Sequence, residues 1–141
     1  MELIEILLDY GLDVNARNDL NQTALMFAAE GGQDEAFFTL LRHGAEPDYQ
    51  INGKYDKMLK WHKGWTALMF AYTRNDYVVA LLDQGADPNI KNAHGLTALY
   101  YALHNMAYPT SVGPYTSTYQ PDVVSTLCAW PTVLDKTGCP Q

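Results

Sequence analysis

The chain has 141 residues, 16 of them acidic and nine basic, which gives a formal net charge of −7. This length suits one domain with one hydrophobic core, and the acidic balance argues against a general nucleic-acid binder. No apolar run approaches the roughly 20 residues that cross a bilayer, and no secretory signal is visible. We therefore expect a single domain that acts on neither nucleic acid nor a membrane.

Two short phrases alternate along the chain and divide it into similar units. The first reads TALMFA at residues 23–28, TALMFA again at 66–71 and TALYYA at 97–102. The second reads GLDVN at 11–15, GAEPD at 44–48 and GADPN at 85–89. Self-similarity at a fixed spacing is the signature of a repeat architecture.

The apolar spacing predicts a series of short helices. Residues 1–10 carry an apolar arc that ends at Gly11, and residues 34–43, 77–84 and 121–130 show the same pattern. Thr23 and Thr66 each precede an apolar run and suit the N-cap position of a further helix, and a similar helix is expected at 97–106. In the second helix of the third unit we expect Val78, Val79, Leu81 and Leu82 to face the core.

The spacing of the units changes twice. Thr66 follows Thr23 by 43 residues, whereas the unit length is about 33, so about ten extra residues extend the hairpin at 49–63, here called the finger. The third unit is two residues short near Arg74, which predicts a tighter turn or shorter helices. Pro109, Gly113 and Pro114 then predict a long loop at 107–120.

These phrases resemble the ankyrin repeat over residues 1–106, and more weakly over 120–131, with Ala in place of the usual Pro. The resemblance implies an all-α solenoid of about three helix-pair repeats behind an N-terminal half repeat. Asn18 and Asn21 stand where this family usually has Asp and Gly, and Asn tolerates the left-handed conformation required there. The single domain, 1–141, then divides into a half repeat at 1–16, a repeat at 17–48, the finger at 49–63, a shortened repeat at 64–90, an interrupted repeat at 91–131 and a tail at 132–141.

The finger is the most distinctive candidate for binding. Four of the nine basic residues fall in one ten-residue stretch of it, with only Asp56 opposing them, and tryptophan and tyrosine are interspersed. Such a cluster would steer a partner with an acidic or mixed surface. By resemblance, further contacts come from the hairpins and from the end of the first helix of each repeat. The predicted partner-binding residues are Lys54, Tyr55, Lys57, Lys60, Trp61, His62, Lys63, Trp65, Arg74, His94 and His104.

The leading hypothesis is therefore a non-enzymatic, monomeric protein-interaction module without cofactor or metal. Trp61 and Trp65 have an alternative role, which is to pack beneath the finger. One alternative function is an inhibitor or immunity-type protein that plugs an enzyme cleft with the finger. A remote one is an enzyme whose site gathers Tyr100, Tyr101, His104 and Cys128 in the interrupted repeat.

Two smaller questions stay open from the sequence. Cys128 and Cys139 either form a disulfide or remain two separate thiols, so they do not fix the compartment, although we favour the cytoplasm. Asn15 and Asn89 resemble the asparagine context that is hydroxylated in animal ankyrin repeats, but we expect them simply to hold their turns. One interpretation of the tail is a cap folded over the last repeat.

Overall fold

The computed structural model describes residues 3–52, 62–104 and 121–140, and within these ranges the secondary structure is helical, with no strand. This confirms the all-α prediction. The helices are α1 (Leu3–Asp9), α2 (Ala24–Gly31), α3 (Asp34–Arg42), α4 (Ala67–Phe70), α5 (Asn75–Asp83), α6 (Ala98–His104) and α7 (Pro121–Ala129).

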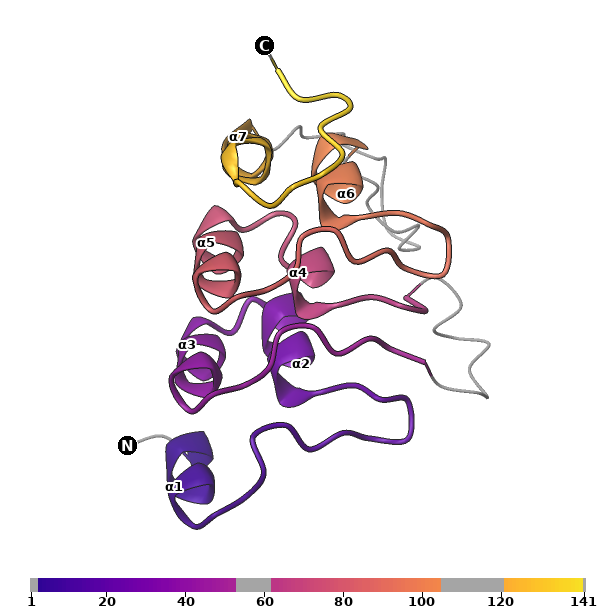
Figure 1. Cartoon of the computed structure of the whole chain (residues 1–141). Helices are drawn as coiled ribbons and strands as arrows, with labels where there is room; N and C mark the ends of the chain where they lie inside the picture. Colours follow the sequence, from indigo (N-terminus) through magenta and orange to yellow (C-terminus); the bar gives the residue numbers. More distant parts are fainter. Residues whose placement is uncertain (1–2, 53–61, 105–120, 141) are drawn as a thin grey trace, which may run out of the picture.

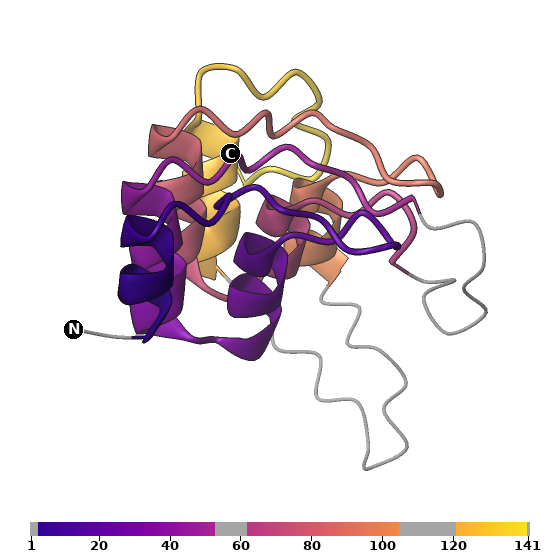
Figure 2. The same ribbon diagram turned by 90° about the horizontal axis from the view of Figure 1, so that it is seen from below.

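The helices stack in two columns (Figure 1). The outer column holds α1, α3, α5 and α7, and the inner column holds α2, α4 and α6. Inner helices pack on one another, α2 against α4 and α4 against α6, and each also packs on an outer helix. The hairpins between units project from the inner column, away from the outer one (Figure 2). The apolar sides of the helices are thus buried against neighbouring helices, as a solenoid requires.

The predicted threonine caps are present. The side-chain oxygens of Thr23, Thr66 and Thr97 accept hydrogen bonds from the backbone N–H three residues later, at 3.3, 3.4 and 3.4 Å. Each bond satisfies an amide that has no partner within its own helix. The third unit, which is two residues short, has a shorter first helix: α4 has four residues, whereas α2 has eight.

Tyr77 is an aromatic core residue that the apolar pattern did not predict. Tyr77 is fully buried, whereas Val79, which we expected in the core, is only half-buried. The Tyr77 ring stacks on Phe37 with ring centroids 3.8 Å apart, and its hydroxyl donates to Asp34 at 2.6 Å. Tyr77 enters the core because its one polar atom reaches a carboxylate at the start of α3.

The hairpin turns have the backbone that the asparagines predict. The side-chain oxygen of Asn18 accepts from two backbone amides at 3.0 and 2.9 Å, and that of Asn92 does so at 2.9 and 3.0 Å. Asn21 is left-handed at φ 64°, like its equivalents Gly64 and Gly95 at 82° and 75°. The substitution of Gly by Asn at position 21 therefore keeps the turn.

The tail folds back over the last helices, and a disulfide joins Cys128 of α7 to Cys139. Val133 is buried in the core cluster. The Asn89 side chain donates to the Thr132 carbonyl at 2.7 Å and accepts from the Leu134 amide at 2.8 Å. The tail thus caps the stack. Asn89 also holds its own turn, because its backbone amide donates to the Asp87 side chain at 2.9 Å.

Candidate protein-interaction surface

The hairpins are bonded to one another into a continuous edge, here called the hairpin ledge (residues 17–22, 49–52, 62–65 and 91–96). The Asn52 amide donates to the Leu20 carbonyl at 3.2 Å, which joins the first hairpin to the second. The Ala93 amide donates to the Lys63 carbonyl at 3.0 Å, which joins the second to the third. The Gln50 side chain bridges the Gly64 and Lys91 carbonyls at 2.8 and 3.0 Å.

The two ends of the finger pair at its base. The Ile51 amide donates to the Trp65 carbonyl at 3.1 Å, and the Gly64 amide donates to the Ile51 carbonyl at 2.7 Å. A Cβ atom on Gly64 would lie 2.7 Å from the backbone nitrogen of Ala93. Glycine is therefore needed here both for its left-handed backbone and for the close approach of the next hairpin.

Trp65 is a core residue, which corrects its prediction as a partner contact. Its side chain is 1% exposed, so it is not available to a partner. Its ring lies 4.5 Å from that of Tyr101, 5.0 Å from Phe70 and 4.9 Å from His62, measured between centroids. The alternative, that this tryptophan packs beneath the finger, therefore holds, because α4 and α6 supply aromatic neighbours that the local sequence does not reveal.

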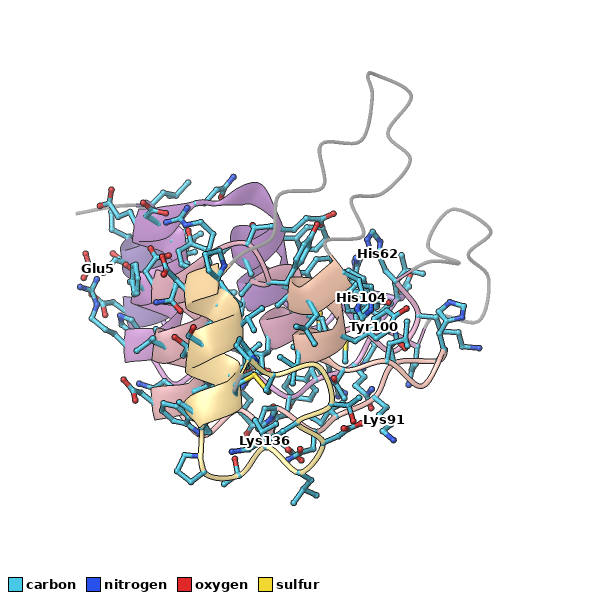
Figure 3. All side chains as sticks on the ribbon, turned by 90° about the horizontal axis from the view of Figure 1, so that it is seen from above. Glu5, His62, Lys91, Tyr100, His104 and Lys136 are labelled. Carbon is cyan, nitrogen blue, oxygen red and sulfur yellow. A yellow bond between two sulfur atoms is a disulfide. The ribbon has the colours of Figure 1, made fainter. Side chains whose placement is uncertain are left out.

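The aromatic contacts continue along α6 to its last residue. The Tyr101 hydroxyl accepts from the Asn92 side chain at 2.6 Å, and the Tyr101 ring is in edge contact with Tyr100. The Tyr100 ring stacks on His104 at 4.1 Å, and both are labelled in Figure 3. A chain of aromatic rings thus joins the base of the finger to the end of the inner column.

His62 lies at the finger end of this chain. It is half-buried, and burial lowers the pKa of its imidazole, because a charged ring is disfavoured away from water. His62 is therefore more readily neutral than an exposed histidine. It contributes an aromatic ring to the surface more than it contributes a charge.

Three predicted partner residues have exposed side chains: Lys63 and His94 on the hairpin ledge, and His104 at the end of α6. They place cationic and imidazole groups on the ledge and beside the inner column. Five predicted residues of the finger lie outside the part of the chain that the structure describes: Lys54, Tyr55, Lys57, Lys60 and Trp61. The plug that the inhibitor alternative requires falls on the same residues.

Arg74 does not lie with the hairpin residues. It follows the inner helix α4 at the end opposite its hairpin, and its guanidinium pairs with Asp34 at 2.8 Å and Asp76 at 2.7 Å. It also lies over the Tyr77 ring, 4.3 Å from the centroid. Arg74 thus links two units, a role that depends on Asp34, 40 positions upstream.

A pocket that the sequence did not predict lies at the C-terminal end of the inner column. It has a volume of about 240 Å³ and lies between α6, at Tyr100 and His104, and the tail, at Asp135 and Thr137. The only local signal is the Asp-Lys-Thr turn, in which Asp135 accepts from the Thr137 amide at 3.0 Å. Nothing in that turn indicates which helix it would face.

The described residues bear on metal binding, membrane spanning and the enzymatic alternative. Among the described residues, no group of three or more His, Cys, Asp and Glu side chains is arranged to hold a metal, and no helix is long and apolar enough to cross a membrane. Cys128 is bonded to Cys139, so the disulfide form lacks the free thiol that the enzymatic alternative would use.

Comparison with known families agrees with this architecture. Residues 1–42 match a family model described as ankyrin repeats (many copies), and residues 49–112 match one described as ankyrin repeats (3 copies). The chain belongs to the ankyrin-repeat family. Proteins of this family are in general protein–protein interaction modules.

Two curated relatives are much longer than this chain. A mitochondrial disaggregase from Bos taurus is 34% identical over 125 residues, which covers 68% of this chain and 18% of that protein. The ankyrin repeat protein nuc-2 from Neurospora crassa is 33% identical over 102 residues, which covers 71% of this chain and 9% of that protein. The chain thus spans less than a fifth of either relative.

Proposed function

We propose that this chain is a non-enzymatic interaction module that binds a protein along the hairpin ledge and the inner column, with the finger as its main determinant. The observation that carries the proposal is the ledge itself, in which backbone bonds join successive hairpins and so fix the base of the finger. Fixing the two ends of a segment in this way lowers the entropy that the segment loses on binding.

The charge distribution supports a partner with an acidic or mixed surface. Lys63 and Lys91 are exposed on the ledge, and the finger sequence carries three further lysines, whereas the chain as a whole is acidic. Opposed patches of this kind steer association and select against like-charged partners.

The test is affinity capture from the native host with wild-type chain and with a variant in which Lys57, Lys60, Trp61 and Lys63 are changed to Ala. We expect the variant to lose the partner while its circular dichroism spectrum is unchanged. The control is Arg42→Ala, which removes an exposed cation from the outer helix α3 and should leave capture intact. Equal capture by the finger variant would show that the finger is not the determinant.

The disulfide bears on the compartment. Disulfides persist in oxidising compartments and are rare in the cytosol. We therefore propose an oxidising compartment in place of the cytoplasm that the sequence favoured. Thiol alkylation of the native protein under denaturing conditions tests this proposal, because the oxidised chain would take up no label before reduction and two labels after it.

A further inference from the structure

The pocket between α6 and the tail has two chemically different walls. Leu99 and Leu103 supply aliphatic surface, and Tyr100 supplies an aromatic ring that stacks on His104. The opposite wall is the tail, which contributes the Asp135 carboxylate and Thr137. In Figure 3, Tyr100 and His104 lie together, with Lys91 on the hairpin side of the tail.

The polar groups of this pocket include acceptors for a cationic donor. Nδ1 of His104 lies 2.9 Å from the Tyr100 carbonyl oxygen, which only accepts, so Nδ1 donates to it and Nε2 is an acceptor whenever the ring is uncharged. Asp135 accepts hydrogen bonds from the amide and from the side chain of Thr137, and its carboxylate keeps further lone pairs that a cationic donor could use. Hydrogen bonds from Thr137, followed by the charge of Lys91, hold the pKa of Asp135 below its usual range.

We propose that this pocket binds a cationic side chain, arginine or lysine, presented by the partner. Aliphatic walls suit the methylene stem of such a side chain, while a carboxylate and an aromatic ring suit its charged head. This inference rests on the proposed function and refines it. The partner would present acidic groups to the finger and a cation to the far end of the inner column.

The tail wall depends on the disulfide. The tail is held by the Cys128–Cys139 bond and by the two hydrogen bonds of Asn89 to Thr132 and Leu134. Gly138 also lies against α6, where an added Cβ would come 3.0 Å from a methyl carbon of Leu103. Removal of the disulfide should free this wall and weaken the pocket while leaving α6 in place.

The test titrates n-butylguanidinium into the ¹⁵N-labelled full chain and follows amide chemical shifts. We expect changes at Tyr100, His104, Asp135 and Thr137, and no such changes with butyrate, which has an opposite charge on a similar stem. Asp135→Asn should weaken binding about threefold to fivefold, as expected for one solvent-accessible ion pair. The matched control is Asp122→Asn, which removes an exposed carboxylate from the first turn of α7, outside the pocket.

Two further variants sharpen the result. Lys91→Gln removes a competing cation near Asp135 and should tighten binding, by about twofold. Cys128→Ser with Cys139→Ser should weaken it. The proposal is overturned if Asp135→Asn binds as tightly as wild type, if butyrate binds equally well, or if the shift changes lie elsewhere. If Asp135→Asn misfolds, the direction of the Lys91→Gln effect still decides.

This experiment is independent of the finger. The variant with the finger residues changed should bind n-butylguanidinium as the wild type does, because the probe needs only the pocket. Loss of partner capture together with intact cation binding supports both proposals. If the finger variant still captures the partner and still binds the cation, the finger is not part of the binding site, and the proposal for the pocket stands.

Discussion

At the scale of single residues, the last position of the GLDVN-like phrase is Asn in two units and Asp in the third. Asn15 donates to the Gly44 carbonyl at 3.4 Å and accepts from the Glu46 amide at 2.8 Å, and Asn89 makes the same pair of bonds to the tail. The equivalent Asp48 only accepts, from the Asp87 amide at 3.0 and 3.2 Å. A carboxylate has no N–H to donate to the next unit.

We predict that Asp48→Asn stabilises the protein by about 0.5–1.5 kcal/mol, the contribution of one added hydrogen bond. Burial, followed by the charges of Asp87 and Glu46, raises the pKa of Asp48, so the ionised form is disfavoured in the folded state. The gain should therefore shrink as the pH falls through the range between the folded pKa and the lower unfolded pKa. Urea unfolding measures it. Asn15→Asp is the control and should destabilise; a loss in Asp48→Asn would contradict the argument.

A second residue-scale prediction concerns Tyr77 and Asp34. The Tyr77 hydroxyl, followed by Arg74, holds the pKa of Asp34 below its usual range, while burial, followed by the bond to Asp34, raises the pKa of Tyr77 to about 12. A carboxylate with a lowered folded pKa stabilises the fold above its unfolded pKa, and this contribution is lost as the pH falls through the folded pKa. In Tyr77→Phe we expect the pKa of Asp34 to rise and stability at neutral pH to fall.

Titration of the Asp34 carboxyl carbon by NMR measures the first effect, and urea unfolding measures the second. Asp76 serves as an internal control, because its lowered pKa is caused first by its hydrogen bond from Arg74 and should change little. An unchanged Asp34 titration in Tyr77→Phe would mean that the tyrosine hydroxyl has no electrostatic role.

At the scale of helices, the inner column differs between its ends. Phe27 of α2 and Phe70 of α4 occupy the same position in identical phrases, yet Phe27 is 50% exposed and Phe70 is 7% exposed. Helix α4 has an inner neighbour on each side, α2 and α6, whereas α2 has only α4 among the described helices. Neighbouring units, more than the phrase itself, decide how much of this ring is buried.

We therefore predict unequal costs for two equivalent substitutions. Phe70→Ala should lower the free energy of unfolding by about 3 kcal/mol or more, as for other buried phenylalanines. Phe27→Ala should cost less than about 2 kcal/mol, because roughly half of its area is already in water. Urea unfolding of the two single variants gives both values from transitions of comparable slope. Equal losses would show that exposure does not govern this position.

The features that the sequence predicted well are those set by local chemistry. A threonine hydroxyl and the amide that it accepts from are three residues apart, so the caps at Thr23 and Thr66 could be read from spacing alone. Tyr77 and Val79 were misjudged because the choice between them depends on Asp34 in another unit. An apolar pattern does not show that a tyrosine hydroxyl has a distant acceptor.

Predictions about the candidate site were limited for a related reason. Trp65 was expected at the surface as readily as in the core, since its burial depends on Tyr101 in the following unit. Arg74 was assigned to a partner by resemblance, and its ion pair with Asp34 could not be foreseen because Asp34 lies 40 residues away in sequence. The spacing of Cys128 and Cys139 allowed both a disulfide and two thiols, and only the fold of the tail distinguishes them.

At the scale of the whole molecule, contacts run between neighbours. Helix α7 packs on α5 and α6, whereas α2 packs on α3 and α4. In a solenoid of this kind, stability is approximately a sum of repeat and interface contributions. A change at the C-terminal cap should therefore act first on the helices that it touches.

This locality gives the last prediction, for Cys128→Ser with Cys139→Ser. Opening the loop between these cysteines should lower the free energy of unfolding by about 2–3 kcal/mol, because a short cross-link restricts the unfolded chain. Hydrogen exchange should accelerate at the Leu134 amide and in α7, while amides of α2 and α3 keep their protection under native conditions. Asn89→Ala, which removes the two side-chain hydrogen bonds from Asn89 to the tail but keeps the disulfide, should accelerate exchange at Leu134 to a smaller extent. Equal acceleration in all helices would instead mean that the stack opens as one cooperative unit, and that the cap stabilises every repeat at once.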